Sequence, residues 1–293
     1  MASKLRFTYY FRKYFIIFIK VIRISIIDTV RQDGIEHAGY LAFLGLVSFL
    51  PFLIILLSLA NAIGIAEYGM SLLIDVIKPL PPSVQQNLKP LLAEVFSSPP
   101  QQFLTIAVFG IIWTASSSVE GLRTILNRAY RVHFPPPYFI RRIFSIVEFF
   151  IVTFVLLVAV LILAIFPLFI GFLLKSMPIS SSFIFLFKLH NVTLLAMAII
   201  ANALLYFGLP NCKQKISQTI PGSVLVAFLL FFILKIFGYY LVHFKQFSLV
   251  YGSFGGIIGL LMVFYLFALA FIFGAEFNYH FHRVYKKFLK KTK

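Results

Sequence analysis

Six long apolar runs, almost free of charge, alternate with polar connections along this chain of 293 residues. A helix needs roughly 20 apolar residues to cross the ~30 Å hydrocarbon layer of a bilayer. No water reaches the backbone in that layer, so a crossing segment must bond its own peptide groups as a helix. The pattern predicts an all-α, polytopic membrane protein with six transmembrane helices at about residues 38–62, 101–121, 146–174, 186–209, 217–242 and 253–279.

Composition excludes the main alternative, a soluble protein with buried core helices. The chain is 61% hydrophobic and only 12% charged, which leaves too little polar surface to face water. The connections between the runs are short, so we expect one transmembrane domain over residues 33–282.

The distribution of Lys and Arg predicts the orientation. Twenty of the 26 basic residues lie before the first run, in alternate connections and in the tail at residues 283–293, and five lie in the other connections. Positive residues are retained on the cytosolic side, so both termini are expected there.

Residues 1–32 form a separate basic segment. Arg12, Lys13, Lys20 and Arg23 interrupt an apolar stretch and share one arc of a helix, which predicts an amphipathic helix lying in the membrane interface. The alternative is a seventh span, but cations in mid-segment cost ~2.5–3.5 kcal/mol each on insertion scales.

A protein with a net charge of +17 could bind nucleic acid or anionic lipid. A single basic patch interleaved with aromatic residues would indicate nucleic acid, whereas these charges are spread over helix ends. We therefore expect membrane lipids with anionic headgroups as partners, with envelope proteins as a further class of partner, and no nucleic acid. The single cysteine, Cys212, excludes an intramolecular disulfide.

Helix breakers suggest a substrate cavity between the first and sixth spans. Proline frees a backbone carbonyl, and spaced glycines let helices approach closely. The candidate cavity residues are Ser48, Pro51, Trp113, Ser116, Tyr251, Gly252, Gly255 and Gly259, with Ser117, Ser118 and Asn202 as further polar lining. The alternative is that these residues serve tight helix packing alone.

Acidic residues concentrate near the cytosolic helix ends, where most of the arginines lie. Unpaired carboxylates near a membrane are costly, so ion pairs are expected. The predicted charge network, which would lock or gate the helices, contains Asp33, Glu36, Glu120, Arg123, Asn127, Arg141, Arg142, Glu148 and Glu276, with Asp28 and Arg128 nearby. The alternative is a set of independent pairs that contribute little energy.

Signals for catalysis are weak. Glu276 and His280, followed by His282, and Asp33 with His37 have the spacing of two ligands on one helix face, but a catalytic zinc normally takes three protein ligands. No phosphate-binding Walker loop is present. We expect no metal, no cofactor and no enzymatic activity.

Several segments resemble one known family. They are DGIEHAGYLAF at residues 33–43 with Ser48 and Pro51, WTASSS at residues 113–118, Pro221 with Gly222, YGSFGG at residues 251–256 and GAEFN at residues 274–278. Their order and spacing resemble the YihY/BrkB family of bacterial inner-membrane proteins. The resemblance implies six spans with both termini cytosolic. Some members of that family have been called ribonuclease BN, and others have been linked to virulence or envelope lipid handling.

Three functional hypotheses follow. The favoured one is a transporter or flippase for an amphipathic, anionic, lipid-like substrate, whose headgroup meets the cytosolic arginines. The second is a membrane scaffold that recruits envelope partners without transport. The third is a membrane-bound ribonuclease, which would need clustered metal ligands and a basic cleft.

Overall fold

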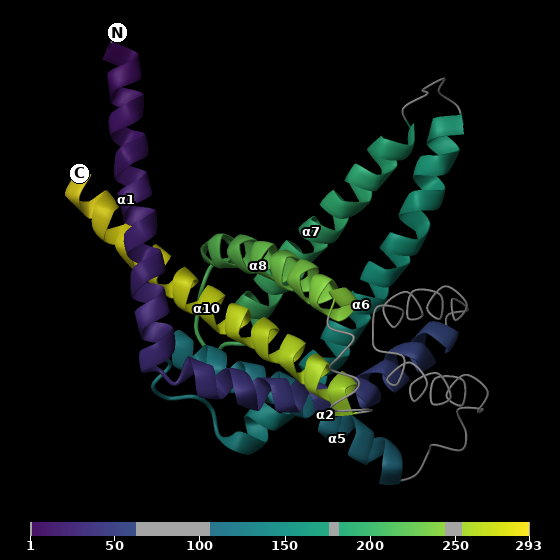
Figure 1. Ribbon diagram of the computed structural model, residues 1–293. Coiled ribbons are helices and arrows are strands. Elements are labelled where there is room, and N and C mark those ends of the chain that lie inside the picture. Colours follow the sequence, from purple (N-terminus) through teal and green to yellow (C-terminus); the bar gives the residue numbers. More distant parts are fainter. Residues whose placement is uncertain (1, 63–105, 176–181, 244–253, 293) are drawn as a thin grey trace.

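The computed structural model describes residues 2–62, 106–175, 182–243 and 254–292, and every regular element in these ranges is an α-helix. The predicted all-α class is therefore confirmed for this part of the chain. The helices are α1 (Ala2–Arg31), α2 (Gly34–Ala62), α5 (Ile106–Ala129), α6 (Tyr138–Lys175), α7 (Ser182–Gly208), α8 (Ile216–His243) and α10 (Phe254–Thr292) (Figure 1).

Four antiparallel contacts organise the centre of the molecule. Helix α2 packs against both α5 and α10, and α8 packs against both α7 and α10. As a result, one end of the molecule holds the first residues of α2 and α8 and the last residues of α5 and α7. Helix α10 passes the same end before it finishes at Thr292. We call this the polar end; it comprises residues 28–37, 127–132, 209–218 and 276–283.

Helices α8 and α10 approach closely because glycines face each other. A Cβ added at Gly222 would clash with the carbonyl oxygen of Gly274, and one added at Gly274 would clash with Val226. The Gly222 N–H donates to Asn278 Oδ1 at 2.6 Å, so the close approach also forms a hydrogen bond between the helices. Nearby, the Tyr206 ring stacks on Phe271 with centroids 4.6 Å apart, and its hydroxyl donates to the Phe271 carbonyl.

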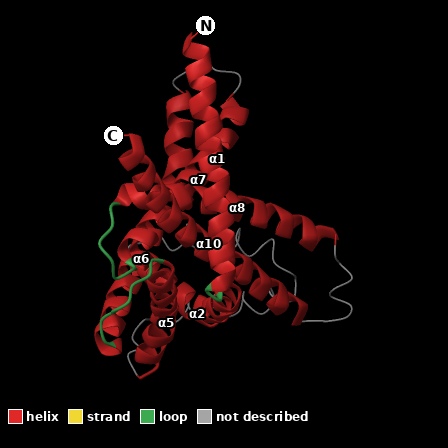
Figure 2. Ribbon diagram, turned by 90° about the vertical axis from the view of Figure 1, so that its left-hand side faces the viewer, coloured by secondary structure: helices red, strands yellow, loops and turns green. Residues whose placement is uncertain are grey.

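Helices α5 and α6 cross instead of forming an antiparallel hairpin. Ser117 contacts Arg142, Glu120 contacts Ser145 and Arg123 contacts Glu148, so the contacts advance in the same direction along both helices. The connection at residues 130–137 runs back beside α5 before α6 begins (Figure 2).

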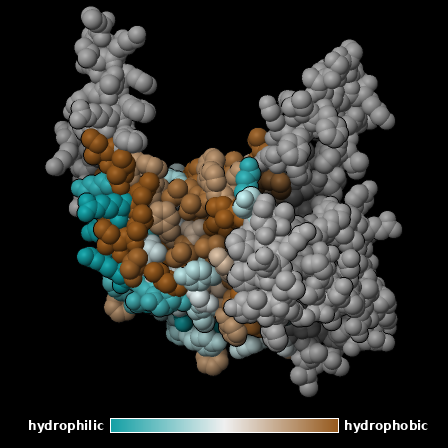
Figure 3. Space-filling view, in the orientation of Figure 1, coloured by the Kyte–Doolittle hydropathy of each residue, from teal (hydrophilic) through white to brown (hydrophobic). Residues whose placement is uncertain are grey.

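Apolar side chains cover much of the surface. Within the described residues, Ile216–Tyr239 and Ile258–Val284 are long and apolar enough to cross a membrane, while Gly34–Phe49 and Val192–Gly208 are apolar but shorter. Exposed Ile143, Phe154 and Ile236 are 61–67% accessible, and Figure 3 shows brown apolar side chains across the middle of the described surface, where Figure 1 places α8 and α10. The six-span arrangement stays a prediction.

Candidate functional site

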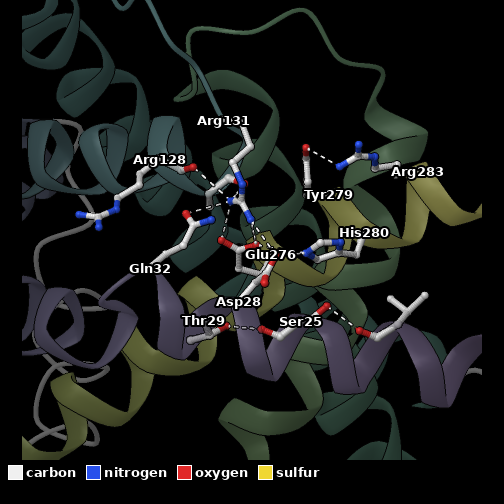
Figure 4. Close-up of polar contacts among 12 residues, drawn as sticks. Ser25, Asp28, Thr29, Gln32, Arg128, Arg131, Glu276, Tyr279, His280 and Arg283 are labelled. Carbon is white, nitrogen blue, oxygen red and sulfur yellow. Dashed lines mark hydrogen bonds and ion pairs between the residues drawn. The ribbon is translucent and has the colours of Figure 1, made fainter.

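Arg131 lies at the centre of an ion-pair cluster at the polar end. Its guanidinium donates to Glu276 Oε1 at 2.9 Å, Glu276 Oε2 at 3.0 Å, Asp28 Oδ2 at 3.1 Å and Gln32 Oε1 at 3.0 Å (Figure 4). His280 Nε2 lies 2.9 Å from Asp28 Oδ2. These five residues, the Arg131 cluster, join the end of α1, the end of α5 and the side of α10.

The end of α5 aims Arg131 into this cluster. The Val132 N–H donates to the Asn127 carbonyl and the Arg131 N–H to the Arg128 carbonyl, which is the Schellman arrangement that terminates many helices. Arg131 takes the left-handed position of this motif with φ 61°, where glycine is usual. An arginine here accepts backbone strain in exchange for its ion pairs.

Electrostatics keep Arg131 charged. Burial of the guanidinium disfavours its charge, but the hydrogen bond and the charge of Glu276 outweigh burial and raise the pKa of Arg131. Glu276 is 1% exposed, so Arg131 neutralises a carboxylate that water barely reaches. The Arg131 cluster is therefore a structural connection whose loss leaves a buried charge.

A second charged cluster lies where α5 and α6 cross. Arg123 pairs with Glu148, and Glu120 accepts from Ser145 at 2.7 Å and lies 3.5 Å from Arg141 Nη1. These five side chains come from the predicted charge network, apart from Ser145, and the structure brings them together. Arg123 is 1% exposed, so this pairing occurs mostly away from solvent.

The remaining predicted network residues have other partners. Arg142 donates to the Trp113 carbonyl and lies 4.0 Å from the centre of the Trp113 ring. Asp33 pairs with Arg128, and Arg128 also contacts His37 Nε2 at 2.6 Å. The other two lie apart from these ion pairs: Asn127 exchanges hydrogen bonds with Asn211, and Glu36 is exposed.

A cavity of about 230 Å³ lies among five helices, about one to two helical turns inward from the polar end. Its lining is almost entirely apolar, with two polar side chains, Ser118 and Asn202. The lining residues are Leu41, Gly45, Ser118, Leu122, Asn202, Leu205, Val226, Leu230, Phe264, Phe267, Ala268 and Phe271.

Two residues that the sequence suggested as further polar lining, Ser118 and Asn202, do line this cavity, whereas the described candidates Ser48, Trp113, Ser116 and Gly259 are absent from the lining. Ser48 donates to the Thr114 carbonyl at 2.9 Å between α2 and α5, and Ser116 donates to the Trp113 carbonyl of its own helix. Trp113 is 52% exposed, and a Cβ at Gly259 would lie 3.6 Å from Phe237. Pro51 and Gly255 lie within α2 and α10. Tyr251 and Gly252 lie outside the described residues.

Sequence reasoning missed the central role of Arg131. In the sequence Arg131 is one cation of a connection among several, and its hydrogen-bonding role depends on which helices meet. A usable signal existed: Arg128 and Arg131 stand at the end of a predicted helix and ahead of three prolines, where cations satisfy terminal carbonyls.

Asp28, Glu276 and His280 are also the one group of described residues with the makeup of a metal site. Their ligand atoms lie within 4.8 Å of one another. The Arg131 guanidinium, however, already bonds both carboxylates, so a divalent cation would have to displace it. His282, the third residue of the weak metal motif, lies 3.1 Å from Gln218 Nε2 instead.

Comparison with known proteins gives three related sequences. The putative ribonuclease-like protein YfkH of Bacillus subtilis (strain 168) is 28% identical over 256 residues, which cover 86% of this chain and 91% of that protein. The UPF0761 membrane protein lpg0643 of Legionella pneumophila is 23% identical, and the UPF0761 membrane protein of its strain Corby is 22% identical. Each match with Legionella covers 89% of this chain but spans only 62% of the longer relative.

No solved structure matches the chain. A family model described as "Virulence factor BrkB" matches residues 27–293, which include every described helix except most of α1. The family resemblance inferred from the signature segments is thereby confirmed. The chain belongs to the virulence factor BrkB family and is a membrane protein.

Proposed function

We propose that this protein moves an amphipathic, anionic, lipid-like substrate across the bacterial inner membrane, which it crosses six times with both termini in the cytosol. The observation that carries the proposal is the cavity among α2, α5, α7, α8 and α10. An apolar cavity inside a membrane protein offers an acyl chain the environment it has in the bilayer. Such a cavity would let the acyl chain of a lipid stay in apolar surroundings while its headgroup moves from one leaflet to the other.

The size of the cavity limits what it holds. Sites for whole drug-sized ligands usually measure ~300–1,000 Å³. At about 230 Å³ this cavity accommodates part of a lipid, and its two polar side chains, Ser118 and Asn202, provide contacts for a polar group. We infer that a stretch of hydrocarbon enters while the remainder of the molecule stays in the bilayer.

Charge at the polar end fits an anionic headgroup. Arg128 lies there with its side chain 45% exposed, and the chain as a whole carries a net charge of +17. Cationic side chains near the cytosolic leaflet attract anionic lipids. The Arg131 cluster would then close the polar end of the molecule, on the cytosolic side of the cavity. Sequence analysis predicted a charge network that locks or gates the helices at these cytosolic helix ends.

Helix packing supports the alternation of direction that six crossings need. The antiparallel contacts place the starts of α2 and α8 and the ends of α5 and α7 together, as six crossings from the cytosol require. The first turns of α1 and the last turns of α10 lie on one side of the molecule (Figure 1). The crossing of α5 and α6 departs from a simple hairpin and would require a strongly tilted third span.

A ribonuclease is the second candidate, because one relative is named ribonuclease-like and Asp28, Glu276 and His280 lie close together. Metal-dependent hydrolysis of RNA needs an open coordination position and a water ligand. Arg131 occupies the space between the carboxylates, so this candidate requires a rearrangement that transport does not.

Purified protein in vesicles tests the proposal. A fluorescent anionic phospholipid placed in both leaflets is bleached from outside by dithionite, and protein-dependent loss of the protected half reports movement. Leu205→Trp fills the cavity, while Leu204→Trp makes the same change at a neighbouring position that is 44% exposed. The first variant should slow movement severalfold, because the indole occupies the space that the acyl chain would enter, and the second should not.

Four outcomes would count against transport. Lipid movement equal to that of empty vesicles rejects it, and so does equal movement by the two tryptophan variants. Capture of an envelope protein without lipid movement would favour the scaffold. Metal-dependent RNA cleavage that is lost in Glu276→Gln would favour the ribonuclease.

A further inference from the structure

The outward face of α1 combines apolar and basic side chains in an unusual way. At 100° per residue, eight of the nine exposed residues of α1 whose side chains are described share an arc of about 140°, and the ninth, Phe18, lies on the opposite side. The members of this arc, which we call the α1 outer face, are Ile16, Ile19, Lys20, Arg23, Ile26, Ile27, Val30 and Arg31. Ile16, Ile19, Ile26 and Val30 are 49–56% exposed, and Figure 3 shows apolar and charged side chains side by side down the left edge, where Figure 1 places α1.

The opposite face of α1 is small and buried. Val21 and Ser25 are fully buried and Thr29 is 5% exposed. The hydroxyls of Ser25 and Thr29 donate to carbonyls one turn earlier, each at 2.8 Å, so the helix satisfies its own polar groups there. Small side chains bonded to their own helix let α1 pack closely on α10.

Contacts at the end of α1 fix which face points outward. Asp28 bonds both Arg131 and His280, and the Phe18 ring meets the Phe277 ring at 5.7 Å. These contacts lie on the inner side of α1, one near each end of the part of the helix whose side chains are described, and they fix its rotation. The α1 outer face is therefore held away from the protein.

We propose that the α1 outer face docks on the anionic surface of a lipid bilayer, with its isoleucines among the acyl chains and its cations at the headgroups. Exposed aliphatic residues alone would fit hydrocarbon, and exposed cations alone would fit water. Their mixture on one arc fits the boundary between them, because Lys and Arg can bury their stems and keep their charges at headgroup level. This inference does not depend on transport.

Charge also distinguishes this occupant from a second copy of the chain. Lys20, Arg23 and Arg31 are the charged residues of the arc, and Asp28 lies off it and is engaged within the Arg131 cluster. Two copies meeting through this face would oppose cation with cation. An anionic leaflet instead offers many negative charges in one plane.

The experiment uses full-length protein in nanodiscs of phosphatidylcholine, with or without phosphatidylglycerol. In a Cys212→Ser background, a fluorescent label at Ile26→Cys reports the outer face, and one at Phe134→Cys reports a position that is 96% exposed in the connection between α5 and α6. Iodide in the water should quench the Phe134 label in every nanodisc. It should quench the Ile26 label much less, and least when phosphatidylglycerol is present.

Charge variants separate membrane docking from other causes of protection. Changing Lys20, Arg23 and Arg31 to Gln should shift the docking equilibrium roughly fivefold per cation, since each cation near an anionic surface contributes that factor. Lys213→Gln with Lys215→Gln removes two exposed cations from another connection and should change nothing.

Each contrary result is distinct. Equal quenching of both labels overturns the proposal, as does protection that ignores lipid charge and the three cations. Protection that persists in detergent and depends on protein concentration would assign the face to a second copy. Failure of lipid transport in the vesicle assay would leave all these results unchanged, because they report docking alone.

Discussion

Arg131 and Glu276 form a two-point ion pair between residues 145 positions apart in the chain, with N–O distances of 2.9 and 3.0 Å. Arg131 maintains this pair from a left-handed backbone conformation. The pair therefore combines local strain with a long-range connection, and the two contributions can be separated by mutation.

Arg131→Met should destabilise the protein strongly. It leaves the Glu276 carboxylate buried and unpaired, which costs ~3–5 kcal/mol for a fully buried pair and about 2–3 here, since Arg131 is 22% exposed. Arg128→Met removes a pair whose side chains are 45% and 57% exposed, so the loss should stay below about 1 kcal/mol. Thermal unfolding in detergent measures both.

A third variant isolates the strain. Arg131→Gly loses the same ion pair but adopts the left-handed conformation freely, so it should be about 1 kcal/mol more stable than Arg131→Met. Equal melting temperatures for Arg128→Met and Arg131→Met would contradict the assigned role of the pair.

Close packing of α8 on α10 predicts a sharp difference between two glycines of α8. Gly222→Ala places a methyl group against the Gly274 backbone and Asn278, whereas Gly238→Ala meets nothing within 4 Å. Overpacking against backbone costs ~1–3 kcal/mol, and the Gly238 change should stay within about 0.5 kcal/mol. Unfolding of the two variants in the same detergent tests this; a similar loss in both would mean that the helices are further apart.

Sequence predicted the helical class because charge-free runs are long and each is bounded by polar residues. It could not predict which acid pairs with which arginine. Asp28 and Arg131 are 103 positions apart, and their contact exists only because α1, α5 and α10 meet at the polar end. Glu120, Arg123 and Glu148 were more accessible to prediction, since two share a helix and the third begins the next apolar run.

Sequence reasoning named only two residues of the cavity lining, Ser118 and Asn202, for a related reason. Proline marks a place where a helix can bend, and glycine a place where a neighbouring helix can pack closely. That neighbouring helix then fills the space beside the glycine, so no cavity remains there. A Cβ at Gly45 would lie 3.1 Å from Phe264, so even the glycine that does line the cavity is in contact with α10. Open space remained where five helices meet, and no single segment of sequence records that.

Titration of the single cysteine should make the free energy of unfolding depend on pH. Partial burial raises the pKa of the Cys212 thiol. Above the ordinary thiol pKa of ~8.5 the unfolded chain loses this proton while the folded chain retains it, so stability should fall as pH rises through that window. Cys212→Ser removes this contribution and should flatten the dependence.

Alkylation measures the same shift directly. Only the thiolate reacts with maleimides, so at pH 7.5 native Cys212 should react more slowly than the same residue in denatured protein, and the rate should rise with pH. Equal rates in native and denatured protein would show that the thiol is neither buried nor shifted in pKa.

Arg131 and a metal ion compete for the same carboxylates, which gives a test that also bears on the ribonuclease candidate. In the wild type the guanidinium bonds Asp28 and Glu276, so Zn²⁺ or Mn²⁺ should leave the melting temperature unchanged and a chelator should have no effect. Arg131→Gln frees Asp28, Glu276 and His280, whose ligand atoms lie within 4.8 Å of one another. Added Zn²⁺ should then stabilise this variant by about 2.7 kcal/mol at a concentration 100 times its Kd, and His280→Ala should abolish the gain. Stabilisation of the wild type by metal would instead mean that Arg131 yields readily, and the metal-dependent ribonuclease would become the stronger candidate.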